Sequence, residues 1–163
     1  MNKEQLNERF EYKDGNLIYK IKNKNAHGIN IGDVVGTIDT KGYRVIKINK
    51  KVYKAHRLIW IYHNGDIEDG LFIDHIDRNP LNNKIENLRL ATRSQNGSNA
   101  TKNITNTSGY KGVSWHKRSK KWMASIKYNC KTINIGGFST AELASEAYKV
   151  AAIKYKGDYA CWE

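Results

Sequence analysis

Asp74 and His75 are adjacent polar residues in an otherwise apolar segment, LFIDHI. An aspartate is a hard oxygen ligand for a divalent cation, and a histidine titrates near neutrality and can take a proton from water. Asn87 and Asn96 follow in the same part of the chain. This set of side chains could hold a cation and activate a water molecule, which is the chemistry that phosphodiester hydrolysis requires.

A structural role is the alternative, because an Asp–His pair is also a common hydrogen-bonded pair of protein interiors. The surrounding pattern predicts strand, loop, strand and helix over residues 71–96, with Thr92 as the N-cap of the helix. Successive strand residues point to opposite faces, so Asp74 and His75 can serve one site only where the strand ends or bends. The residue types alone leave both roles open.

The residues before this segment are expected to be rich in β structure. A short helix is predicted first, followed by hairpins that turn at Asp14-Gly15, Lys41-Gly42 and Lys50-Lys51. The segment HRLIWIYH, residues 56–63, is predicted to be a short buried helix. His27 and His63 belong to no motif and are interpreted as structural or exposed.

The charge of the chain points to a polyanionic partner. The chain of 163 residues has 28 Lys and Arg against 16 Asp and Glu, a net charge of +12. The acid-free stretch 87–141 carries ten of the cations. Nucleic acid is the expected partner, and a membrane surface the competing one, although no basic amphipathic helix supports it.

Other features narrow the class of protein. No apolar run is long enough to span a membrane, and the N-terminus has no signal-peptide core, so a cytoplasmic location is expected. Cys130 and Cys161 have no metal-ligand spacing and are predicted to be free.

A second unit is expected after a polar linker over residues 97–109. Three strands are predicted within 110–138, followed by a helix that Ser139 or Thr140 caps and Gly157 ends. Small alanines at helical spacing would let this helix lie close to the sheet. Trp122 is expected to pack in this core, and Trp115 could face either the core or a ligand.

The segment IDHIDRNPLNNKIENLRLATRSQN resembles the HNH endonuclease motif, the ββα-metal nuclease fold, in its phage and intron-encoded branch. The resemblance implies that Asp74 is the first metal ligand and His75 the general base. It also implies that Asn87 braces the loop and orients the histidine ring. Asn96 stands where many members have a histidine as second metal ligand, which favours Mg²⁺ or Mn²⁺ over Zn²⁺.

His56 and Arg57 match an HR pair that precedes the motif in that family. The resemblance implies that His56 acts near the scissile phosphate or supports the site, and that Arg57 contacts phosphate. A purely structural role within the helix is the alternative for His56.

The segment GYKGVSWHKRSKKWMASIKYNCKTINIGGFSTAELASEAYKVAAIKYKGDYA, residues 109–160, resembles the Apetala-type (ethylene-response-factor) DNA-binding domain, which lays a three-stranded sheet in the major groove. The shared residues are Gly112, Val113, Trp122, Ala124, Ile126, Gly136, Phe138, Thr140, Ala144, Ala147, Tyr148, Ala151 and Ala152. Several arginines of that family are absent, so no target sequence can be inferred. Carried over by position, the DNA-facing residues are Lys111, His116, Ser125, Lys127 and Asn134. Five further cationic residues are expected to contact DNA, mainly at its phosphates: Arg93, Lys117, Arg118, Lys120 and Lys121.

Taken together, the sequence predicts an α+β protein with a β-rich N-terminal segment, a ββα-metal nuclease core, a linker, and a three-stranded antiparallel sheet packed on one helix. The predicted domains are a nuclease domain at 1–96, with its motif core at 71–96, the linker at 97–109 and a DNA-binding domain at 110–163. The expected activity is metal-dependent cleavage of double-stranded DNA by a site-directed phage or homing-type enzyme. The alternatives are a DNA-binding regulator with an inactive nuclease core and an RNA-binding protein. Monomer and homodimer both remain open.

Overall fold

The computed structural model describes residues 1–21 and 29–162, and His27 lies outside them. The chain divides into two compact units, Met1–Thr92 and Arg93–Glu163. The boundary lies close to the end of the predicted nuclease domain. No helix in the described part of the chain is long and apolar enough to cross a membrane.

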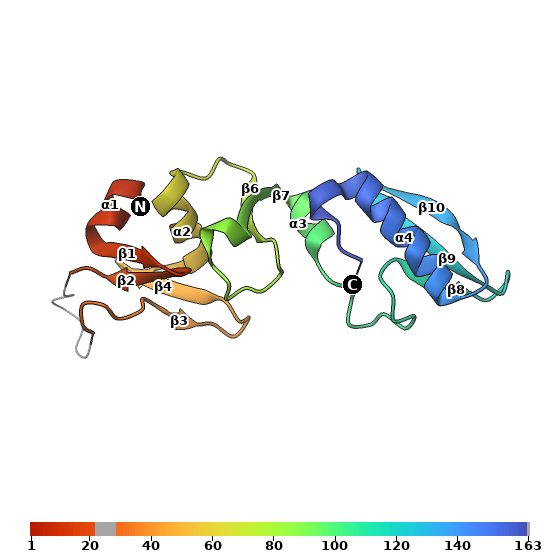
Figure 1. Ribbon diagram of the computed structural model, residues 1–163, viewed down its shortest axis with the longest axis horizontal. Coiled ribbons are helices and arrows are strands. Elements are labelled where there is room, and N and C mark those ends of the chain that lie inside the picture. Colours follow the sequence, from red (N-terminus) through yellow and green to blue (C-terminus); the bar gives the residue numbers. More distant parts are fainter. Residues whose placement is uncertain (22–28, 163) are drawn as a thin grey trace. The chain divides into compact units, whose positions relative to one another are not determined.

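The first unit begins with a short helix and two small antiparallel sheets, as the sequence predicts (Figure 1). A capping box on Asn2 and Gln5 starts the first helix. The helices and strands of this part are α1 (Lys3–Arg9), β1 (Phe10–Lys13), β2 (Asn16–Tyr19), β3 (Thr37–Ile38), β4 (Arg44–Ile48), β5 (Lys51–Lys54) and α2 (Ala55–Asn64).

The turns of these hairpins use residues with positive φ. Asp14 and Gly15 form the β1–β2 turn as predicted, with φ of 47° and 79°. The turn between β4 and β5 is Asn49-Lys50, with φ of 49° and 64°, so the prediction of Lys50-Lys51 is wrong by one residue. Asparagine tolerates the left-handed conformation better than lysine does, which explains why the turn begins at Asn49.

The first unit ends with the elements that carry Asp74 and His75. These are β6 (Leu71–His75), the 3₁₀ helix η1 (Ile85–Asn87) and β7 (Leu88–Thr92), and β6 pairs with β7 in an antiparallel ladder. The core lies around α2, whose Leu58 and Ile59 are completely buried. Apolar side chains from every neighbouring element surround them: Leu6, Phe10, Leu17, Ile46, Ile73 and Leu88.

The second unit contains the predicted β-β-β-α arrangement. Its elements are α3 (Arg93–Asn99), β8 (Val113–His116), β9 (Lys121–Tyr128), β10 (Lys131–Phe138), α4 (Ala141–Lys156) and the 3₁₀ helix η2 (Gly157–Tyr159). The helix α3 extends three residues into the segment predicted as linker. Thr140 caps α4 and Gly157 ends it, as predicted.

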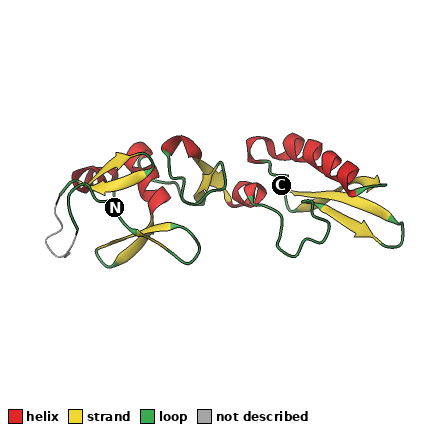
Figure 2. Cartoon of the chain, turned by 60° about the horizontal axis from the view of Figure 1, so that its bottom comes forward, coloured by secondary structure: helices red, strands yellow, loops and turns green. Residues whose placement is uncertain are grey.

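The sheet of the second unit has the order β10-β9-β8, and α4 covers one of its faces (Figure 2). Small side chains allow the close approach, because Ala144 and Ala152 on α4 are completely buried against Ala124 and Ile126 on β9. Trp122 packs against this core as predicted. Trp115 is 46% exposed and touches Trp122 edge-on, with ring centroids 5.2 Å apart.

Gly15 provides a test of how the first hairpin supports the rest of the first unit. A Cβ atom at this position would lie 2.8 Å from the backbone nitrogen of Lys84, in addition to the strain of its positive φ. Gly70 has a similar φ of 84° but open space around it. We expect Gly15→Ala to lower the free energy of unfolding by about 2–3 kcal/mol and Gly70→Ala by about 1 kcal/mol.

Denaturant titration of both variants measures this difference. Equal losses of stability in the two variants would show that the β1–β2 turn does not pack tightly against the segment around Lys84.

Candidate nuclease site

The pairing of β6 with β7 determines where Asp74 and His75 lie. Asp74 is the cross-strand partner of Arg89, and His75, the last residue of β6, is the partner of Leu88. The carboxylate of Asp74 accepts a hydrogen bond of 2.9 Å from Nε of Arg89. Both Asp74 and His75 are buried, with 5% and 6% of their surface exposed. The strand therefore ends at the predicted pair, as a shared site would require.

A cluster of aromatic rings surrounds His75. The ring of His56, on α2, lies edge-on to it with centroids 5.0 Å apart. Tyr43, in the loop before β4, lies 5.6 Å from the His56 ring and 6.2 Å from the His75 ring. The structure thus brings together the two predicted catalytic histidines and adds a tyrosine that the sequence did not single out.

Asn83 contacts the His75 ring directly. Its Oδ1 lies 2.9 Å from Nε2 of His75, and the asparagine is 1% exposed. Because a carbonyl oxygen can only accept, this contact favours the tautomer in which Nε2 carries the proton. Nδ1 then holds the lone pair that a general base needs.

Asn87 braces the loop between β6 and β7. Its amide nitrogen donates to Oδ1 of Asp77 at 2.9 Å and to the carbonyl of Asn82 at 2.8 Å, and its Oδ1 accepts from the backbone nitrogen of Asp77. Its own carbonyl accepts from the backbone nitrogen of Ile76. These contacts of Asn87 lie within the loop, and the hydrogen bond with the His75 ring is made by Asn83.

The first hairpin supports the same loop from the other side. The hydroxyl of Tyr12 accepts a hydrogen bond of 3.0 Å from the backbone nitrogen of Ile85, and Gly15 packs against Asn83 and Lys84. Asn83 is therefore held in a segment whose backbone is fixed by residues some 70 positions earlier in the chain.

Lys54 lies at the edge of the ring cluster. Its ammonium group lies 4.3 Å from the centroid of the Tyr43 ring and forms an ion pair with Asp39 at 2.5 Å. Hydrogen bonds from Lys54 and from the backbone of Tyr43 hold the pKa of Asp39 below its usual value. Asp39 thus ties both Lys54 and the Tyr43 backbone in place beside the two histidines.

Asp74 gives the site a buried carboxylate, a hard oxygen donor that suits Mg²⁺ or Mn²⁺. Within residues 1–21 and 29–162, no group of three His, Cys, Asp or Glu side chains could hold a metal together. This donor set fits a hard cation that keeps several water molecules and does not fit a closed zinc site. The predicted second ligand, Asn96, is an exposed residue of α3, in the second unit.

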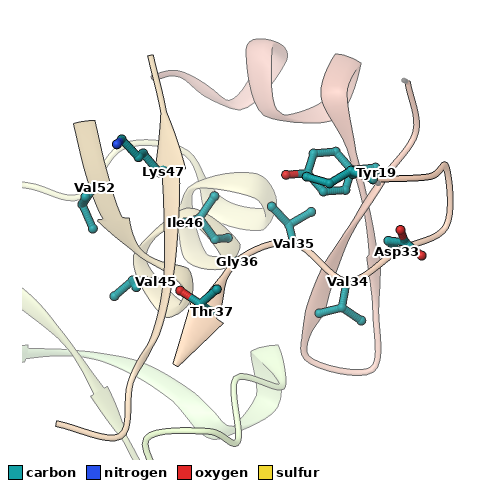
Figure 3. A pocket seen from close by; sticks show the side chains of 11 residues that line it. Tyr19, Asp33, Val34, Val35, Gly36, Thr37, Val45, Ile46, Lys47 and Val52 are labelled. Carbon is teal, nitrogen blue, oxygen red and sulfur yellow. The ribbon is translucent and has the colours of Figure 1, made fainter. Parts of the chain in front are cut away.

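A hollow beside the β3–β4–β5 sheet does not belong to this site. It has a volume of about 780 Å³, and its lining includes the apolar Val34, Val35, Val45 and Val52 and the charged Asp33 and Lys47 (Figure 3). Neither of the clustered histidines lines it. The candidate chemistry therefore lies at the end of β6 and not in this hollow.

The predicted DNA-contacting residues of the second unit fall mostly on one face of its sheet. By strand alternation, the face away from α4 presents His116, Ser125, Lys127 and Asn134, and Ser125 and Asn134 are cross-strand partners. The cations Lys117, Arg118, Lys120 and Lys121 are exposed at the β8–β9 turn, and Arg93 is exposed on α3. In the first unit, Arg57 is exposed on α2 next to the buried His56.

Lys111 lies elsewhere. Its ammonium group donates to the backbone carbonyl of Ser98 at 3.0 Å and also to that of Ala100. The resemblance placed it with the DNA-facing residues, whereas in the structure it binds the end of α3.

The protonation of His56 gives a test of the ring cluster. Burial lowers the pKa of His56 to about 3, and the nearby His75, Lys54 and Arg57 act in the same direction. Between about pH 3 and 6.5 the unfolded chain binds a proton at this residue that the folded chain does not. Stability should therefore fall as the pH drops through this window, by about 1 kcal/mol per pH unit.

Equilibrium unfolding at pH 4, 5, 6 and 7 measures this slope. In His56→Asn we expect a visibly smaller difference in stability between pH 4 and pH 7. The same slope in both proteins would mean that another group controls the acid sensitivity.

Comparisons with known proteins match each part of the chain to a known family. The model of the HNH endonuclease family matches residues 53–98, and that of the AP2 domain matches residues 108–158. Protein 3.8 of Escherichia phage T7 is 39% identical over 106 residues, which are 63% of this chain and 88% of that protein.

An uncharacterized HNH endonuclease of Acanthamoeba polyphaga mimivirus is 35% identical over 66% of this chain and 55% of its own length. Among solved structures, the chain is similar to one titled "DNA binding and cleavage by the HNH homing endonuclease I-HmuI", with 20% identity, a TM-score of 0.48, and coverage of 96% of this chain and 90% of that one. From the two family matches and the phage relative, the chain belongs to the HNH endonuclease family and also carries an AP2 domain.

Proposed function

We propose that this protein is a metal-dependent DNA endonuclease of the phage or homing type, in which His75 is the general base. The observation that carries the proposal is the end of β6, where a buried carboxylate and a buried histidine are adjacent and the histidine ring donates a hydrogen bond to Oδ1 of Asn83. Membership of the HNH family supports it, since such nucleases generally use a divalent metal.

In this proposal the side chains have separate tasks. Asp74, with Asn96 as the second proposed ligand, would hold Mg²⁺ or Mn²⁺, and the cation would supply positive charge against the charge that develops on the phosphate. His75 takes a proton from the attacking water through Nδ1, the nitrogen that the Asn83 contact leaves with a lone pair. Asn87 keeps the loop in shape.

His56 is proposed to support the site in its neutral form. Its burial disfavours protonation, so it contributes a ring and a polar nitrogen but no positive charge near neutral pH. Arg57, exposed one residue further along α2, is proposed to contact a DNA phosphate. The face of the β8–β10 sheet away from α4 is proposed to bind double-stranded DNA, and the β8–β9 turn is proposed to contact phosphates.

One observation favours the alternative of a DNA-binding regulator with an inactive nuclease core. The guanidinium group of Arg89 lies 2.9 Å from Asp74 and neutralises the carboxylate that a cation would need. On the endonuclease proposal, Asp74 would accept a cation while its ion pair with Arg89 loosens or is shared. On the regulator alternative, Arg89 holds Asp74 permanently.

Cleavage of supercoiled plasmid, with and without Mg²⁺, separates the two functions. We expect metal-dependent nicking by the wild type and a loss of at least about 10²-fold in His75→Ala, the usual scale for removing a general base. Binding of DNA without metal-dependent nicking by the wild type would support the regulator.

Asn83 gives a second, more specific test. Asn83→Ala removes the contact to Nε2 of His75 and leaves His75 itself in place. We expect the maximal nicking rate to fall about tenfold or more, with little change in affinity for DNA, because only the orientation of the base is affected.

Asn82→Ala is the matched control, because it removes a neighbouring asparagine side chain that bonds to Asp77 and not to His75. If both variants lose the same activity, the effect comes from the loop as a whole and not from the ring contact.

A further inference from the structure

The last helix of the nuclease motif folds with the second unit. The HNH endonuclease match runs to residue 98, but the first compact unit ends at Thr92. The helix α3, which carries Asn96, therefore belongs by its contacts to the unit that holds the AP2 domain. Within that unit it packs against η2, at the end of α4.

The sequence of α3 is unfavourable for a helix standing alone. It has only seven residues, RSQNGSN, and its interior contains Gly97. Ser98 also donates its hydroxyl to the carbonyl of Ser94, a contact that competes with regular helical hydrogen bonding. Helices of this length and composition depend on tertiary contacts for their stability.

Lys111 provides such a contact at the C-terminal end of α3. Its ammonium group donates to the carbonyl of Ser98, in the last turn of α3, and to that of Ala100, directly after the helix. Carbonyls at a helix C-terminus have no partner within the helix itself. A cation at this end is also favoured by the helix dipole. Asn99, the last residue of the helix, is buried in the same region.

We propose that Lys111 is a positioning residue, which fastens α3 to the AP2 unit and so stabilises the helix that carries Asn96. Lys111 lies two residues before β8, at the start of the sheet module. The AP2 unit then has a second task besides binding DNA, because it completes the fold of the nuclease motif. The part of this proposal that concerns Asn96 as a metal ligand rests on the proposed function.

Hydrogen exchange of the full-length chain tests whether Lys111 stabilises α3, and it does not depend on any enzymatic activity. In Lys111→Met we expect the amides of residues 97–100 to exchange about fivefold to tenfold faster, with the amides of β9 and α4 unchanged. Lys111→Arg, which keeps donors and charge, should retain most of the protection.

Lys102→Met is the matched control. Lys102 also donates to a backbone carbonyl, that of Gly109, and its loss removes the same charge from the same region. We expect no change in the exchange of α3 in this variant. Unchanged exchange of α3 in Lys111→Met, or equal acceleration in both variants, would overturn the proposal.

The dependence of plasmid nicking on Mg²⁺ concentration tests the consequence for the site. We expect Lys111→Met to need several times more Mg²⁺ than the wild type for half-maximal nicking, and Lys102→Met to need the same amount. Both variants should show a similar small loss of affinity for DNA. A larger loss of DNA affinity in Lys111→Met with unchanged exchange of α3 would make Lys111 a DNA contact and refute the positioning role. If the wild type does not nick DNA, the proposed function fails, and the exchange experiment still decides the role of Lys111.

Discussion

The register between β6 and β7 is the constraint on which the candidate site depends. It sets Asp74 opposite Arg89 and His75 opposite Leu88. Since side chains alternate between the two faces of a ladder, a slip by one residue would exchange the environments of Asp74 and His75. The carboxylate would leave its guanidinium partner, and the histidine would leave the ring cluster. Two five-residue strands therefore determine the surroundings of both the proposed metal ligand and the proposed base.

The loop that joins these strands is held by hydrogen bonds between its own residues. The side-chain amide of Asn87 both donates and accepts hydrogen bonds within the loop. Asp77 accepts hydrogen bonds from Asn79, Asn82 and Asn87. Partial burial raises the pKa of Asp77, but these hydrogen bonds outweigh it and lower the pKa overall. Amide side chains suit this task because each can donate and accept at once. A loop closed in this way presents Asn83 to His75 in one orientation.

Much of this arrangement could be predicted from the sequence, because it depends on local patterns. The compact apolar segments LFIDHI and LRLA indicated β6 and β7, and the caps at Thr140 and Gly157 delimited α4. Asn83 could not be predicted, since it is one of several asparagines in the same loop and only the folded backbone selects it. Tyr43 and Arg89 escaped prediction for a related reason. Their roles depend on the packing of a distant loop and on a strand register, neither of which leaves a local signal.

The ion pair between Arg89 and Asp74 also bears on how the protein is made in the cell. In many small metalloproteins a cluster of anionic ligands repels itself until the ion arrives, so that the chain cannot fold without it. Here a guanidinium built into the neighbouring strand balances the buried carboxylate. Synthesis and folding can then proceed before any divalent cation is acquired. On the proposed function, the binding of a cation would therefore follow folding and would not be required for it.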